Sequence, residues 1–157
     1  MKNEYLNIYN NLIKLTRNKE IFEKLSNDET FSDRLILLMI HFAFFIKVYK
    51  KPNNKKEFQE IHDFFFKQLE LSIREIGYGD VTINKKMKEY INLFHSILSK
   101  IDNWNDLNDS NKSKILTKYF PLNVNGLNLT KYFDKYVKLL SKTTLNSLIK
   151  GVIKLKI

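Results

Sequence analysis

The side chains best suited to chemistry are three histidines, His41, His62 and His95. They fall on three different predicted helices, and none has a second histidine four residues away, as a zinc-binding helix of the His-Glu-x-x-His type requires. The chain also has no cysteine, which excludes thiol nucleophiles and thiolate metal sites. Each histidine is therefore expected to be structural or interfacial, and neither a metal nor a cofactor is predicted.

Other catalytic motifs are also missing. The sequence has no Gly-x-Ser-x-Gly turn of a hydrolase and no glycine-rich loop of the phosphate-binding kind. Gly77 and Gly79 follow a predicted helix, whereas a dinucleotide-binding loop follows a strand. The carboxylates are scattered without an obvious acid and base pair. The sequence predicts a binding protein and not an enzyme.

Residues 74–88 combine a helical corner with many charges. Gly77 suits the residue just past a helix end, and Thr82 suits the cap of the next helix. Capping leaves most of the charged side chains unexplained: Arg74, Glu75, Asp80, Lys85, Lys86 and Lys88. One interpretation is that the segment only sets the angle of a helical hairpin. The alternative is that it presents a polar recognition surface to a partner.

Composition predicts an all-α protein. At 157 residues, with 43% hydrophobic residues, the chain suits one domain with a substantial core. Four glycines and two prolines favour helices with short connections over a β fold. We expect residues 1–157 to form a single compact domain of about six to eight helices with a central helical hairpin.

Apolar residues recur with helical spacing along most of the chain. The predicted helices span residues 3–16, 18–25, 32–50, 55–76, 83–101, 111–119, 128–141 and 144–155. The helix at 32–50 is apolar nearly all round, so it is expected at the centre, with Phe42, Phe44 and Phe45 in the core. An exposed hydrophobic surface on that helix is the alternative. Ile76 is expected to end the core stripe of the following helix.

The net charge of +10 is concentrated in the last third of the chain. Residues 110–157 hold ten lysines and one acid, Asp134. Such a segment attracts phosphate, on RNA or on an anionic membrane, although a solvated surface is the simpler interpretation. The last predicted helix is basic and amphipathic, so it either lies on a membrane or docks on its own domain. The candidate contacts to an anionic surface are Lys142, Lys150, Lys154 and Lys156.

The location expected from the sequence is the cytoplasm. The longest apolar run, residues 35–46, is shorter than the roughly 17–25 residues that span a bilayer. The first residues lack the apolar centre of a signal peptide. We expect a cytoplasmic protein, with peripheral association at the cytoplasmic face of the inner membrane as a further expectation.

Two motifs resemble the ubiquinol–cytochrome c chaperone family. The first is the run IREIGYGD at residues 73–80, followed by KKMK at residues 85–88. The second is TFSDRL at residues 30–35, followed by Ile40 and His41. Both occur in the order found in the family. The likeness covers about residues 20–100 and fades toward the C-terminus.

The resemblance implies a non-catalytic assembly chaperone for respiratory complex III of an alphaproteobacterium-like organism. Its implied client is newly made or newly inserted cytochrome b. A ribosome with its rRNA, the anionic inner-membrane surface and a small partner subunit are further implied partners. The candidate partner-binding residues are Arg34, His41, Arg74, Glu75, Asp80, Lys85, Lys86 and Lys88. The alternative is an RNA-binding, ribosome-binding or peripheral membrane module without a role in complex III.

Overall fold

The computed structural model describes residues 2–17, 21, 31–120 and 125–150. Most of the helix predicted at 18–25 lies outside the described residues. The end of the helix predicted at 144–155 does too, together with Lys154 and Lys156. The motif at residues 30–35 is described from Phe31 onward.

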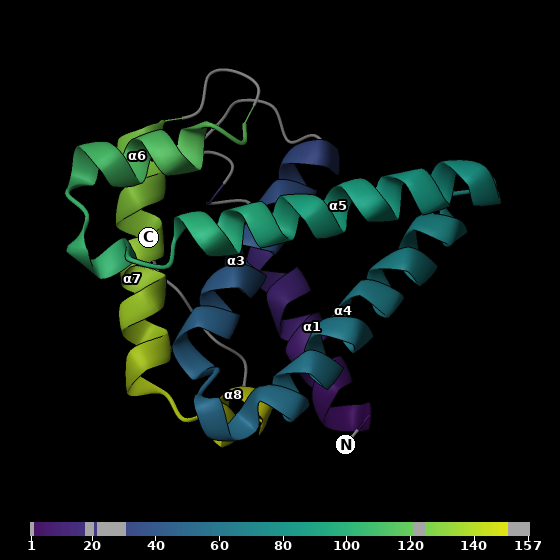
Figure 1. Ribbon diagram of the computed structural model, residues 1–157, viewed down its shortest axis with the longest axis horizontal. Helices are drawn as coiled ribbons and strands as arrows, with labels where there is room; N and C mark the ends of the chain where they lie inside the picture. Colours follow the sequence, from purple (N-terminus) through teal and green to yellow (C-terminus); the bar gives the residue numbers. More distant parts are fainter. Residues whose placement is uncertain (1, 18–20, 22–30, 121–124, 151–157) are drawn as a thin grey trace.

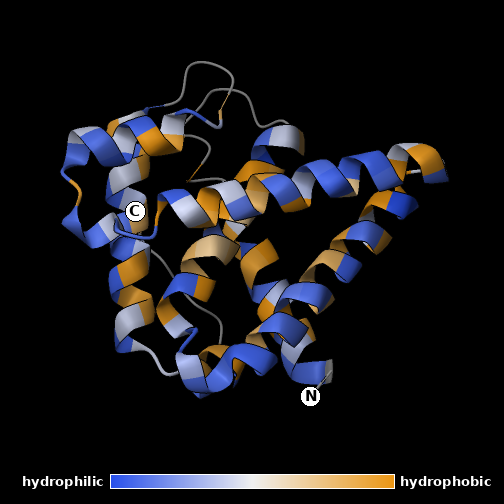
Figure 2. Cartoon of the chain, viewed as in Figure 1, coloured by the Kyte–Doolittle hydropathy of each residue, from blue (hydrophilic) through white to orange (hydrophobic). Residues whose placement is uncertain are grey.

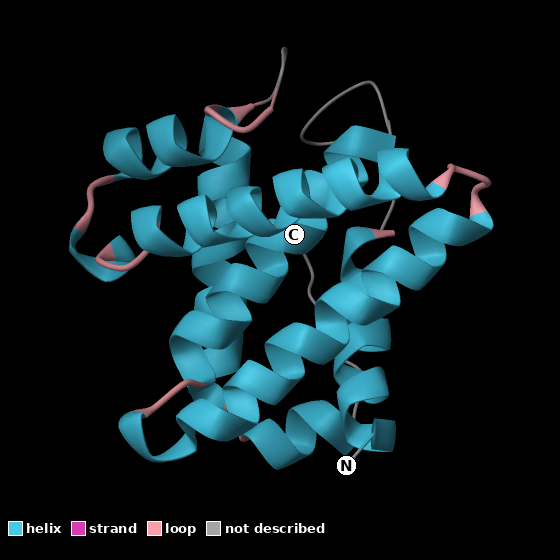
Figure 3. Cartoon of the chain, turned by 45° about the vertical axis from the view of Figure 1, so that its right-hand side comes forward, coloured by secondary structure: helices cyan, strands magenta, loops and turns pink. Residues whose placement is uncertain are grey.

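Helices account for nearly all of the described chain, and no strand occurs there (Figure 3). This confirms the predicted all-α fold. Seven α-helices and two 3-10 helices are described, in the order α1 Lys2–Thr16, α3 Phe31–Tyr49, η1 Pro52–Asn54, α4 Lys55–Glu75, α5 Asp80–Lys100, η2 Trp104–Asp106, α6 Asp109–Thr117, α7 Gly126–Lys142 and α8 Leu145–Lys150.

Helix α3 occupies the centre of the molecule, packed against α1, α5 and α7 (Figure 1). Phe42, Phe44 and Phe45 are fully buried, and Ile46 is nearly so. The prediction that these residues form core is confirmed. The alternative, that part of this apolar arc is exposed, is wrong because the neighbouring helices bury these four side chains.

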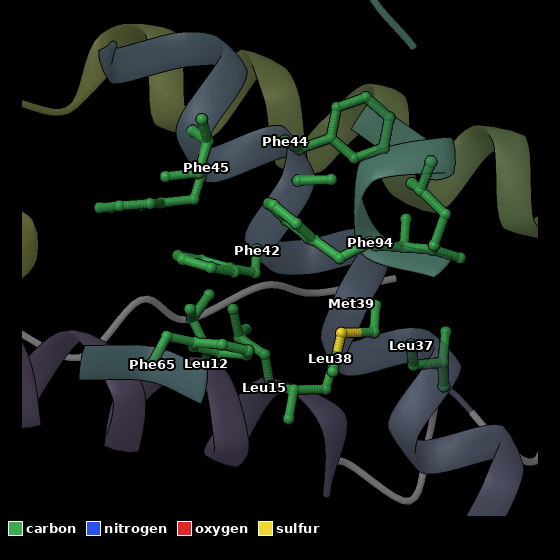
Figure 4. Close-up of a cluster of buried hydrophobic side chains, with 14 of the residues drawn as sticks. Leu12, Leu15, Leu37, Leu38, Met39, Phe42, Phe44, Phe45, Phe65 and Phe94 are labelled. Carbon is green, nitrogen blue, oxygen red and sulfur yellow. The ribbon is translucent and has the colours of Figure 1, made fainter. Parts of the chain in front are cut away.

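Stacked phenylalanines join three helices of this core. The ring of Phe42 on α3 lies 3.9 Å from that of Phe65 on α4, with 14° between their planes. On α5, the ring of Phe94 lies 5.0 Å from Phe42 (Figure 4). All three side chains are at most 2% exposed. The predicted hairpin of α4 and α5 is thus fixed to α3 by one continuous aromatic stack.

His41 fastens α3 to α7 from inside the core. Its Nδ1 lies 2.7 Å from the Leu37 carbonyl oxygen, which can only accept, so Nδ1 carries the hydrogen. The Tyr132 hydroxyl then donates to Nε2 at 2.6 Å. The Tyr136 hydroxyl donates to the His41 carbonyl oxygen at 3.1 Å. Because His41 is fully buried, it cannot itself touch a partner, and its inclusion among the partner-binding candidates is corrected to a structural role.

Helices α6 and α7 pack closely around the only acid of residues 110–157. Asp134 Oδ1 accepts from Trp104 Nε1 at 2.9 Å and from Lys112 Nζ at 3.0 Å. Gly126 begins α7 where a Cβ atom would lie 2.0 Å from Ser113 Oγ, so any larger residue there would have to displace side chains of α6. Through its two hydrogen bonds, Asp134 joins α7 to η2 and to α6.

Candidate functional site

The corner between α4 and α5 is built by two glycines. Gly77 adopts φ +105°, a left-handed conformation that favours glycine, and its amide donates to the Arg74 carbonyl oxygen at 3.0 Å. Gly79 is extended, and its carbonyl oxygen accepts from the Ile83 amide at 3.0 Å. Helix α5 therefore begins at Asp80. The prediction of Thr82 as the helix cap is wrong, because the chain re-enters the helix three residues earlier.

Arg74 closes this corner through two carboxylates. Its guanidinium donates to Asp80 across the turn and to Glu70 Oε1, one helical turn back, at 3.0 Å. The hydrogen bond from Arg74 lowers the pKa of the Glu70 carboxyl. The Arg74 side chain nevertheless remains 39% exposed. This pairing favours the architectural interpretation for Arg74 and Asp80, and it leaves both within reach of a partner.

The other predicted charges surround the same corner. Glu75, Lys85 and Lys88 are exposed. Lys86 is half-buried, and its Nζ lies 5.0 Å from the centre of the Tyr78 ring, a cation–π contact. Arg34 does not belong to this cluster. It is half-buried on α3 and lines a separate groove that meets the corner at Ile76.

Exposed apolar side chains at the corner were missed by the sequence analysis. Leu71, Ile76, Tyr78 and Val81, here called the corner patch, are large and exposed, with Val81 at 85%. Figure 2 shows the hydrophobic colouring where α4 and α5 meet. The prediction that Ile76 belongs to the core is wrong: α4 ends at Glu75, and Ile76 is 55% exposed. Leu71 and Val81 lie outside the apolar stripes that form the core side of their helices. Their positions in the sequence could therefore have predicted that they are exposed.

A groove of about 370 Å³ adjoins the corner patch, and we call it the arginine groove. It lies between α1, α3 and α4, and Ile76 belongs to both surfaces. Two cations, Arg17 and Arg34, line it, and none of its described lining residues is acidic. The remaining lining residues are mostly apolar: Tyr9, Ile13, Thr16, Phe31, Leu35, Leu38, Leu69, Ser72 and Ile73. Corner patch and groove together offer an apolar surface with charged edges.

The basic C-terminal third presents its lysines on one side of α7. Lys131, Lys135, Lys138 and Lys142 are all exposed, and their spacing of four, three and four residues places them in one row along the helix. We call this row the α7 lysine stripe. Opposite it, Tyr132, Phe133, Tyr136 and Leu140 are fully buried in the core.

Helix α8 docks on the protein's own domain. Leu148 is buried, and its carbonyl oxygen accepts from Asn11 Nδ2 on α1 at 3.0 Å. Lys150 is exposed at the end of the helix. For Leu145–Lys150 the structure therefore favours docking over insertion into a membrane interface.

The described residues define an all-helical protein. They contain no cluster of three or more side chains suited to hold a metal ion, and the residues above form no arrangement of nucleophile and base. None of the described helices is sufficiently long and apolar to span a bilayer. What the fold does present is a charged corner, an apolar patch and an adjoining groove.

The chain belongs to the ubiquinol-cytochrome C chaperone family, whose model matches residues 23–155. This confirms the family predicted from the two motifs, and the match extends well beyond residue 100. The fold is similar to the crystal structure of the Cbp3 homolog from Brucella abortus, with a TM-score of 0.73 and 24% identity over 96% of this chain and 87% of that one. No curated protein sequence gives a significant match.

Proposed function

We propose that this chain is a non-catalytic assembly chaperone for ubiquinol–cytochrome c reductase, respiratory complex III, that binds newly made cytochrome b through the corner patch and the arginine groove. Membership of the chaperone family supports the general role. The observation that carries the proposed site is the exposure of Val81 and Ile76 beside an apolar groove. Large apolar side chains exposed beside an apolar groove are typical of interaction sites.

The chemistry of this surface suits a membrane protein as the client. A newly made membrane protein exposes apolar segments that must be covered until they are packed. The corner patch supplies apolar contact area, while Glu75, Lys85 and Lys88 form a charged rim around it. Apolar centres with polar rims are the usual anatomy of protein interfaces. In the groove, Arg17 adds a positive charge that suits a carboxylate or the C-terminal end of a helix.

The double variant Ile76→Glu, Val81→Glu tests the site. Both side chains point to solvent, so the fold and the melting temperature should change little. Capture of cytochrome b by the tagged chaperone in the native organism should fall at least about tenfold, because each new charge would be desolvated at the interface. Ubiquinol–cytochrome c reductase activity should fall with it.

Leu127→Glu is the matched control, since Leu127 is a similarly exposed apolar side chain at the start of α7, on the other side of the molecule (Figure 1). It should leave capture and reductase activity unchanged. Normal cytochrome b capture by the double variant would refute the proposed site. Normal reductase activity after deletion of the whole gene would refute the proposed function.

The α7 lysine stripe favours a second function, binding to ribosomal RNA beside the site where the client is made. Four exposed lysines in a row match the repeated charges of a phosphate backbone.

The proposal places the protein in the cytoplasm, at the cytoplasmic face of the inner membrane. A small partner subunit, which the family resemblance also implies, should then co-purify with the chain.

Replacing Lys131, Lys135, Lys138 and Lys142 by Gln should weaken co-sedimentation with ribosomes. The salt dependence should also become shallower, by about 0.7 in the log–log slope for each lost phosphate contact. The control replaces Lys51, Lys55, Lys56 and Lys100, which are also exposed and carry the same total charge. Equal losses in both variants would show that net charge alone matters. Flotation with anionic vesicles, without ribosome binding, would favour a membrane as the ligand.

A further inference from the structure

Two of the three histidines meet between α4 and α5. The ring centres of His62 on α4 and His95 on α5 lie 5.2 Å apart, with 34° between the ring planes. Phe66 and Phe94 flank the His62 ring, with ring centres 4.9 Å and 5.6 Å away. The third histidine is His41, which is sealed in the core with both ring nitrogens hydrogen-bonded.

The hydrogen bonding of His62 leaves one ring nitrogen ready to act as a ligand. Its Nδ1 lies 3.1 Å from Asp63 Oδ1. An ionised carboxylate only accepts, so Nδ1 carries the hydrogen and Nε2 has a free lone pair. Nε2 is enclosed and has no hydrogen-bond partner among the described residues. A carboxylate behind a histidine whose other nitrogen is bare is the usual arrangement of a metal-binding histidine.

We propose that His62 and His95 form a two-histidine site for a divalent transition-metal ion, Zn²⁺ or Cu²⁺, that bridges α4 and α5. Imidazole nitrogens bind zinc at about 2.0–2.1 Å, and a tetrahedral angle between two such ligands places their ring centres about 5 Å apart. The ring centres of His62 and His95 lie at this separation, 5.2 Å apart. Because no third ligating side chain joins the cluster in the described chain, water completes the coordination.

The surroundings of His95 favour its neutral form at pH 7. Burial, followed by the nearby His62 and Lys50, lowers the pKa of His95 below its ordinary value, so its ring is unprotonated there. Asp63 lies beside His62, and Lys50 is close enough to His95 for its positive charge to act on that ring. The two phenylalanines restrict the rotation of the His62 ring. Metal binding would fasten the two helices whose far ends carry the corner patch.

Titration calorimetry of the untagged, full-length protein with ZnCl₂, and separately with CuCl₂, tests this site. At pH 7.5 we expect one ion per chain, with binding at least about tenfold weaker in His62→Gln and in His95→Gln. Zn²⁺ should raise the melting temperature of the unmodified protein and leave that of both variants unchanged. At pH 5.5 binding should weaken, because protons compete for the imidazoles.

Ser99→Gln is the control, since Ser99 is exposed on α5 one turn beyond His95 and has no part in the proposed site. It should bind as the unmodified protein does. In a histidine NMR spectrum, Zn²⁺ should shift the signals of His62 and His95 and leave those of His41 in place. Absence of binding, or binding that either histidine variant retains within twofold, would overturn the proposal. These readouts do not depend on cytochrome b, so they stand apart from the proposed function.

Discussion

Lowering the pH from 7 toward 4 should cost the protein about 3 kcal/mol of unfolding free energy through His41 alone. Burial lowers the pKa of His41 from 6.5 to about 4, and the hydrogen bond to the Leu37 carbonyl opposes this only in part. The folded protein therefore excludes a proton that the unfolded chain accepts. Few single side chains can affect stability as much over this range of pH.

The sign of the effect follows from the two protonation states. Above about pH 6.5 His41 is neutral in both states, and its contribution to stability is fully present. As the pH falls below 6.5, the unfolded chain binds the proton first and becomes favoured. The loss continues until the pH approaches the folded pKa of about 4. Between pH 7 and 5 it should already reach about 2 kcal/mol, at about 1.4 kcal/mol for each pH unit below 6.5.

Urea unfolding at a series of pH values between 5 and 7 measures this dependence without titrating most carboxylates. His41→Gln should be less stable at pH 7, because the side chain no longer matches both Leu37 and Tyr132, and its stability should vary far less with pH. His62→Gln, measured with a metal chelator present, should keep the steep dependence. An unchanged pH slope in His41→Gln would show that another group titrates.

Phe42→Ala should destabilise the protein by about 3–5 kcal/mol. The Phe42 ring is fully buried, and it touches rings of α4 and α5 at the same time. Removing it leaves a cavity that the surrounding rigid helices can close only in part. Because small domains are typically stable by only about 5–15 kcal/mol, the variant should be close to unfolding at physiological temperature.

Chemical unfolding at pH 7, followed by circular dichroism, compares this variant with Phe31→Ala. Phe31 also lies on α3 but is 40% exposed, so the same substitution there should cost less than about 1 kcal/mol. Phe31 lines the arginine groove, so its variant should instead weaken capture of cytochrome b. Similar losses of stability in the two variants would contradict the placement of Phe42 at the centre of the core.

The two stability predictions also clarify the family motifs. The histidine that follows the TFSDRL motif, His41, is sealed between α3 and α7, so in this chain it meets a packing requirement. The IREIGYGD motif contains both architecture and exposed surface. Gly77 and the pair of Arg74 with Asp80 shape the corner, whereas Ile76 and Tyr78 project from it. The partner-binding role is therefore proposed for the projecting residues.

Local patterns in the sequence were sufficient to predict the helices and the family. They also showed that familiar catalytic motifs are missing from the sequence. Helical periodicity depends on neighbours within about four residues, so α1, α3, α4 and α7 could be placed within two residues of their bounds. The start of α5 was misplaced, because Gly79 could take the capping position ahead of Thr82. Tightly spaced motifs identified the family, which the match over residues 23–155 confirms.

Contacts between distant helices decided the rest. Periodicity shows which side of a helix is apolar but not whether a neighbour covers it, so Ile76 was assigned to the core although its side chain is 55% exposed. His41 was classed with the partner-binding candidates because it matches the family motif, and the sequence could not show its hydrogen-bond partner, Tyr132, which lies 91 residues away. His62 and His95 looked isolated for the same reason. Only the packing of α4 against α5 brings their rings together.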